Sequence, residues 1–123
     1  SCVANVIEDV LIYTDNIILV NDGSTDASGD ILESYHQLAL ISYSKNKGKG
    51  YALRKAFDYA RMKGNYYAIT MDADGQHKAE DLPLYLDELE KNGHSLILGS
   101  RNMQQHGVPA KSSFGNRFSN FWF

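Results

Sequence analysis

Little in this chain of 123 residues points to disulfides, membrane spans or nucleic acids. Cys2 is the single cysteine, so no internal disulfide can form, and a reducing compartment fits this composition. No apolar run reaches the roughly 20 residues of a membrane-spanning helix, and no basic patch followed by an apolar core indicates a signal peptide. The formal net charge of −3 argues against a protein that binds nucleic acid through a broad basic surface. We therefore expect a cytoplasmic protein that binds no nucleic acid.

The signatures of several enzyme classes are missing as well. The G-x-x-x-x-G-K-[ST] pattern of P-loop ATPases is absent. Neither Cys2 nor any serine has an identifiable base partner for covalent catalysis. His77, His94 and His106 lack the spacing of a metal-binding pair. The chain has no initiator methionine and ends on an aromatic cluster, so we expect a piece of a longer protein.

Helical and strand-like segments alternate along the chain, and 43% of its residues are hydrophobic, which is enough for a core. Apolar residues recur at helical spacing over residues 3–11, and the β-branched run 17–20 is typical of a strand buried on both faces. The same reasoning predicts further helices and strands, with helices at 28–35, 51–63, 82–89 and 114–123 and strands at 38–43, 67–71 and 95–98. Thr25 or Asp26, Asp81 and Gly64 are the expected helix caps. The sequence therefore predicts an α/β fold with a mostly parallel sheet flanked by helices, in which ligands bind beyond the carboxyl ends of the strands.

Two carboxylates follow the predicted strand 67–71 with one small residue between them. In an extended chain, side chains two residues apart point the same way, so Asp72 and Asp74 could aim at one point. Gly75 allows a sharp turn, and Gln76 adds a neutral oxygen. Hard oxygen donors of this kind suit Mg²⁺ or Mn²⁺. The alternative is a simple turn capped by an aspartate side chain.

Two more polar segments follow predicted strands. After strand 17–20, Asp22 could accept hydrogen bonds from a nucleotide base or ribose, while Gly23 and Ser24 allow close approach of a ligand. The loop 46–50, with Gly48 and Lys49, resembles a phosphate cradle before a helix N-terminus. A polar turn and a solvated basic loop are the respective alternatives.

Three cations follow the last predicted strand, namely Arg101, Lys111 and Arg117. Together they could hold an anionic substrate through charge-assisted hydrogen bonds, although surface solvation would explain each one singly.

Taken together, four motifs resemble those of family 2 glycosyltransferases. They are V-N-D-G-S-T-D at 20–26, N-K-G-K-G-Y-A-L at 46–53, M-D-A-D-G-Q-H at 71–77 and G-S-R-N at 99–102. The similarity is greatest to dolichyl-phosphate mannose and glucose synthases and their bacterial relatives, and it covers nearly the whole chain. It implies a GT-A fold and the inverting transfer of a sugar from a nucleoside-diphosphate sugar, with Mg²⁺ or Mn²⁺. The implied acceptor is a lipid phosphate or a glycan, with peripheral contact at the cytoplasmic face of a membrane.

The resemblance also implies roles for individual residues. Asp22 would contact the base, Asp72 the ribose and diphosphate, and Asp74 and Gln76 the metal. Arg101 and Arg117 would bind phosphate of the donor or acceptor, and with Asp74 they would assist departure of the leaving group. The family's opening strand, which carries I-P-x-Y-N, its carboxyl-terminal region and a catalytic base are not found here. We therefore expect residues 1–123 to be an incomplete GT-A domain.

Two other functions remain open at this point. A sugar-nucleotide nucleotidyltransferase also places metal-binding carboxylates on an α/β sheet. It normally shows a glycine-rich loop with Arg and Lys near the amino end, and no such loop is visible in this sequence. A nucleotide-binding module without catalytic activity is the second alternative.

Overall fold

The structure, a computed structural model, describes residues 2–93 and 96–99. Residues 1–93 form one compact unit and residues 94–123 a second, of which 96–99 are described. The predicted helix 114–123 and the three cations at 101, 111 and 117 lie outside the described residues.

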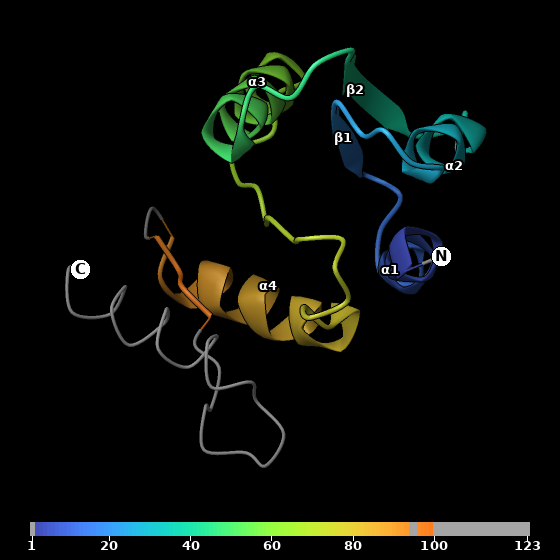
Figure 1. Cartoon of the computed structure of the whole chain (residues 1–123). Helices are drawn as coiled ribbons and strands as arrows, with labels where there is room; N and C mark the ends of the chain where they lie inside the picture. Colours follow the sequence, from blue (N-terminus) through green and yellow to red (C-terminus); the bar gives the residue numbers. More distant parts are fainter. Residues whose placement is uncertain (1, 94–95, 100–123) are drawn as a thin grey trace, which may run out of the picture. The chain divides into compact units, whose positions relative to one another are not determined.

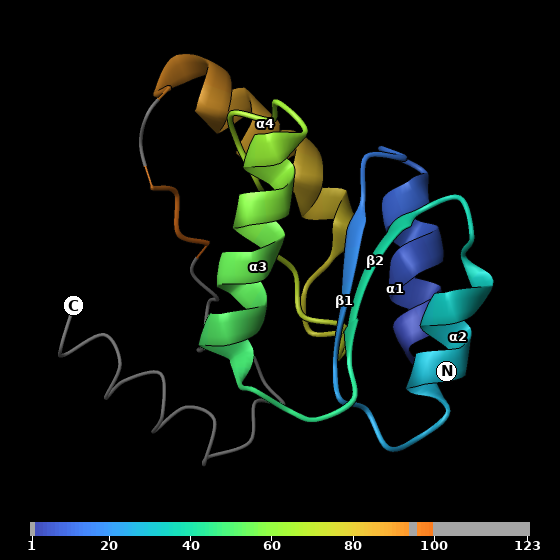
Figure 2. The same cartoon turned by 90° about the horizontal axis from the view of Figure 1, so that it is seen from above.

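The first unit alternates helices and strands up to residue 62, as the sequence predicts. Its elements, in chain order, are α1 (Cys2–Leu11), β1 (Ile18–Asp22), α2 (Ser28–Ser34), β2 (Ala39–Tyr43), α3 (Lys49–Met62), the 3₁₀ turn η1 (Ala79–Asp81) and α4 (Leu82–Lys91). Strands β1 and β2 pair in parallel, and α2 connects them. Helices α1 and α2 lie on one side of the strand pair and α3 on the other (Figures 1 and 2). This α/β layout with a small parallel sheet confirms the predicted fold class.

The main apolar cluster lies between the strand pair and the helices α1 and α2. It consists of one buried residue each from α1, β1 and α2 and one just before β2, namely Ile7, Leu19, Leu32 and Leu38. Val3 and Leu11 pack against this cluster from the face of α1 that carries Ile7. The helical spacing of apolar residues over 3–11 therefore identified the buried face of α1 correctly.

Two predicted strands are not formed. Residues 67–71 and 96–98 have no regular secondary structure, and Tyr66 and Tyr67 are 94% and 48% exposed. A strand exists only where a neighbouring strand completes its hydrogen-bond ladder. In the described part of the chain, β1 pairs along one edge with β2 and no strand pairs its other edge. The apolar composition of residues 67–71 fitted a strand, but composition does not supply a partner.

The predicted caps have different outcomes. Gly64 (φ +83°) ends α3 as expected, since its N–H donates to the carbonyl of Arg61 and the next N–H, of Asn65, donates to the carbonyl of Ala60. Asp81 directly precedes α4 but makes no capping hydrogen bond. Its backbone is already helical as the last residue of η1, whereas a capping side chain needs extended backbone to reach back.

The cap of α2 differs from the predicted Thr25 or Asp26. Ala27 occupies the cap position and has no side chain that could form a hydrogen bond, and Asp26 accepts a 3.0 Å hydrogen bond from the N–H of Ser28 through Oδ1.

No helix in the described residues has the length and apolar character needed to cross a lipid bilayer.

Candidate functional site

Asp22 ties the carboxyl end of β1 to the loop after β2. Its Oδ1 accepts a 2.8 Å hydrogen bond from the N–H of Lys47, and its Oδ2 accepts a 2.8 Å bond from the N–H of Gly48. The register of the sheet makes this possible, because Asp22 lies opposite Tyr43, the last residue of β2. Two of the predicted segments are thus joined at the edge of the sheet where ligands bind in folds of this type.

Gly23 is required by this close packing. Its φ is +72°, and a Cβ atom at this position would lie 2.4 Å from the nitrogen of Asn46 and 2.6 Å from the carbonyl carbon of Lys45. Both neighbours are backbone atoms, so they cannot rotate away as a flexible side chain could. The turn after β1 and the loop after β2 therefore pack backbone against backbone, which only glycine allows.

Asn21 is a residue of this region to which the sequence analysis gave no role. It is 7% exposed, donates through Nδ2 to the hydroxyl of Ser42 (3.2 Å) and accepts through Oδ1 from the N–H of Ser24 (2.9 Å). One amide side chain thereby links the two strands and closes the turn that follows β1. A polar residue at the end of an otherwise apolar strand is the sequence signal that could have identified it, because buried polar groups are almost always hydrogen-bonded.

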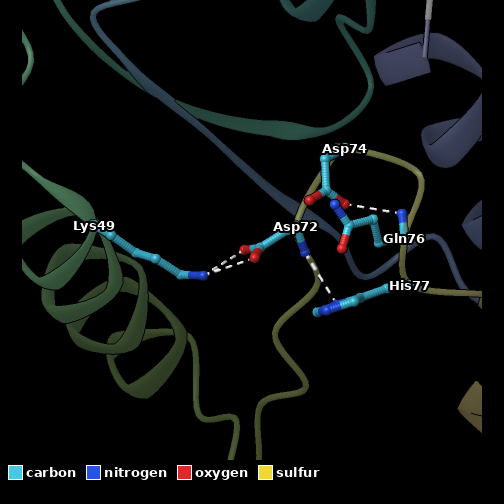
Figure 3. A network of polar contacts seen from close by, with 5 residues as sticks. All are labelled: Lys49, Asp72, Asp74, Gln76 and His77. Carbon is cyan, nitrogen blue, oxygen red and sulfur yellow. Dashed lines mark hydrogen bonds and ion pairs between the residues drawn. The ribbon is translucent and has the colours of Figure 1, made fainter. Parts of the chain in front are cut away.

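Lys49 joins the third segment to the other two. It is the first residue of α3, and its Nζ lies 2.7 Å from both carboxylate oxygens of Asp72. Figure 3 shows the lysine and aspartate side chains extended toward each other. The side chains are 68% and 45% exposed, so the pair is accessible to solvent and to ligands.

The D-A-D-G-Q segment forms a tight turn. Asp74 accepts a 2.9 Å hydrogen bond from the N–H of Gln76, the N–H of Asp72 donates to Nδ1 of His77 (3.3 Å), and Gly75 has φ +76° (Figure 3). The aspartate-capped turn considered as the alternative is therefore present. Because the chain turns from residue 73 onward, the alternation of an extended strand stops at Asp72, and the two carboxylates have different partners.

The chemistry of this segment fits a magnesium or manganese ion. Asp72, Asp74 and Gln76 offer two carboxylates and an amide, which are the oxygen donors these cations prefer. Among residues 2–93 and 96–99, no three His, Cys, Asp or Glu side chains come together in a group that could hold a metal ion. The turn would therefore supply only part of a coordination shell, and a ligand with its own oxygens, such as a diphosphate, would have to supply more.

An aromatic cluster borders the loop after β2. The Tyr43 and Tyr51 rings meet edge to face with centroids 5.3 Å apart, and Nζ of Lys47 lies 5.4 Å and 4.9 Å from the two centroids. Desolvation, with smaller contributions from Tyr51 and Asp22, raises the pKa of Tyr43 above its ordinary value of 10.0. Lys47 and Lys49, two residues apart, therefore have different partners, and the loop is held on both sides.

The structure brings together most of the predicted site residues that it describes. Asp22, Gly23, Gly48, Lys49 and Asp72 form one connected set at the carboxyl ends of β1 and β2. Asp74 and Gln76 follow directly in the same turn. A hollow of about 510 Å³ lies at the other end of the strands, near Asp15 and Lys63. The predicted phosphate-binding residues Arg101 and Arg117 lie outside the described residues.

Comparisons with known proteins show the family of this chain. The model of the Glycosyl transferase family 2 matches residues 1–118. The chain belongs to this family. The α/β layout with a small parallel sheet is consistent with the expected GT-A fold. No solved structure matches the chain.

Several curated relatives are similar over much of the chain. An uncharacterized protein of Methanocaldococcus jannaschii is 30% identical over 95% of this chain and 53% of its own length. A dolichyl-phosphate beta-glucosyltransferase of Trichomonas vaginalis is 31% identical over 76% of the chain and 30% of its own length. The polyprenol monophosphomannose synthase of Mycolicibacterium smegmatis is 31% identical over 70% of the chain and 34% of its own length. The chain thus spans about half or less of the length of these relatives.

Proposed function

We propose that the protein to which this chain belongs is an inverting glycosyltransferase. It would move a sugar from a nucleoside-diphosphate sugar to a polyprenyl phosphate in glycolipid or cell-envelope biosynthesis. Membership of the family and the names of the relatives support the reaction class and the acceptor. The observation that carries the proposal is the joining of three motifs at one edge of the sheet. Asp22 accepts hydrogen bonds from N–H groups of the 46–50 loop, and Lys49 forms an ion pair with Asp72.

Donor binding would use groups that this edge already presents. Each carboxylate oxygen of Asp22 accepts one backbone hydrogen bond in the structure and has a further lone pair. Asp22 can therefore accept another hydrogen bond from a base N–H or a ribose hydroxyl. Lys49 brings a positive charge to the place where a diphosphate would lie beside Asp72. Gly48, where a Cβ atom would meet nothing within 4 Å, leaves room for such a ligand to approach the backbone.

Asp72, Asp74 and Gln76 are the residues that would hold Mg²⁺ or Mn²⁺. A divalent cation bound there supplies charge neutralisation for a departing nucleoside diphosphate. Arg101 and Arg117 would contribute further positive charge to phosphate of the donor or acceptor.

A polyprenyl phosphate suits a site without an evident catalytic base. The second pKa of a phosphate monoester is about 6, so the acceptor is mostly dianionic at neutral pH and nucleophilic without deprotonation. A single displacement by this oxygen would invert the anomeric carbon. Such an acceptor would bring the protein to a membrane surface, which we place on the cytoplasmic side.

The test is a donor screen on the full-length protein. Radiolabelled nucleoside-diphosphate sugars would be incubated with a polyprenyl phosphate and Mg²⁺ or Mn²⁺, and label in the organic phase would be measured. We expect metal-dependent transfer for at least one donor, loss of transfer in Asp74→Asn, and an inverted anomeric configuration by NMR. Nucleotide binding without transfer to any acceptor would instead favour a non-catalytic module. Pyrophosphate release from a nucleoside triphosphate and a sugar phosphate would favour a nucleotidyltransferase.

A further inference from the structure

The ion pair between Lys49 and Asp72 differs from the other ion pairs of the described residues. Arg61 with Asp58 and Lys91 with Asp87 link neighbours three or four positions apart on one helix. The Lys49–Asp72 pair instead joins two motifs that are 23 positions apart. Its ammonium contacts both carboxylate oxygens at 2.7 Å, which is the contact expected of a fully formed charge-assisted pair.

The loop before α3 holds Lys49 in position for this contact. Gly48 directly precedes Lys49, and the N–H groups of Gly48 and Lys47 are both bound by the carboxylate of Asp22. The side chain of Lys47 lies over the rings of Tyr43 and Tyr51 and is thereby kept apart from Asp72. Asp22 on β1 thus anchors the loop so that Lys49, and not Lys47, is directed at the D-A-D-G-Q turn.

We propose that Lys49 is a built-in counter-cation of Asp72, which competes with divalent cations for this carboxylate and is released to an anionic ligand. An ammonium at 2.7 Å from both oxygens of Asp72 repels a second cation at the same oxygens. The pair is also weak enough to exchange, because both side chains are substantially exposed and exposed ion pairs contribute little. Once released, the Lys49 ammonium lacks a counter-charge. Its transfer to a diphosphate is the part of the inference that rests on the proposed function.

The first measurement needs Mn²⁺ alone. Isothermal titration of Mn²⁺ into the protein would be compared between the unsubstituted chain, Lys49→Met and Lys47→Met. We expect Lys49→Met to tighten Mn²⁺ binding by up to about fivefold, which corresponds to the upper value of about 1 kcal/mol for an exposed pair. Lys47→Met is the matched control, because it removes the same charge from the same loop but does not contact Asp72. Thermal unfolding would verify that both variants fold.

The second measurement uses UDP and GDP at saturating Mn²⁺. Here Lys49→Met should weaken nucleoside-diphosphate binding by about tenfold or more, since a charged hydrogen-bond donor is lost. The same substitution therefore has opposite effects on the two ligands.

The possible results separate this inference from the proposed function. Equal tightening of Mn²⁺ binding in Lys47→Met and Lys49→Met would overturn the competition, because it would reflect net charge alone. No tightening in Lys49→Met, or no Mn²⁺ binding in any variant, would overturn it as well. Tightening specific to Lys49→Met, with no UDP or GDP binding in any variant, would support the competition and contradict the proposed donor site.

Discussion

Replacing Gly23 by alanine should cost the fold several kcal/mol, although it adds a single carbon atom. Alanine at φ +72° costs about 1–2 kcal/mol in backbone strain alone. The new Cβ would also lie 2.4 Å from the nitrogen of Asn46, so the loop after β2 must move away. This movement would break the two hydrogen bonds that Asp22 accepts, each of which contributes on the order of 1 kcal/mol at a half-exposed position. We expect a total loss of about 3–4 kcal/mol.

Gly64 provides a matched control for this prediction. Its φ of +83° is equally left-handed, but a Cβ there would meet nothing within 4 Å. Gly64→Ala should therefore lose only the strain of about 1–2 kcal/mol. Urea unfolding followed by circular dichroism measures both free energies of unfolding. Equal losses for the two variants would refute the argument that Gly23 is required by the approach of the second loop.

Three further outcomes follow from the same contacts. Asp74→Asn should abolish metal-dependent diphosphate binding, and affinity within error of the unsubstituted protein would contradict its assignment as a ligand. Asp22→Ala should weaken nucleoside-diphosphate binding by about tenfold or more and pyrophosphate binding as well, because it releases the loop that positions Lys49; a loss confined to the nucleoside would argue against this anchoring role. Hydrogen bonds from the side chain and then the backbone of Ser28 lower the pKa of Asp26 below 3.8, so its contribution to stability is present above that pH and lost as pH falls through the lowered pKa. Ser28→Ala should raise this pKa in an NMR titration, and an unchanged value would contradict the cause given.

Local features of the fold were predictable because their physics lies within a few residues. The spacing of Val3, Ile7 and Leu11 identifies the buried face of α1, and Gly64 marks the end of α3, since helix periodicity and left-handed caps depend on local sequence. The strand predicted at 67–71 was wrong for the opposite reason. Its residues favour a strand, but strand formation depends on a partner elsewhere in the chain.

The candidate site shows the same division. The turn at Asp74 was open to prediction as one of two alternatives, because an aspartate bonds its own backbone two residues on. The pairing of Lys49 with Asp72 and the binding of loop N–H groups by Asp22 were not predicted, since they join segments more than 20 positions apart. The position of these segments after predicted strands indicated one edge of the sheet, but only the folded backbone determines which groups meet.

The most direct test of the account is to locate where a nucleoside diphosphate binds. Amide chemical shifts of the ¹⁵N-labelled protein would be followed while UDP or GDP is added with Mg²⁺, which is diamagnetic. The account predicts that the largest changes occur at Gly23, Gly48 and Gly75, at the carboxyl ends of β1 and β2. Changes confined to the hollow at the opposite end of the strands, near Asp15 and Lys63, would contradict it.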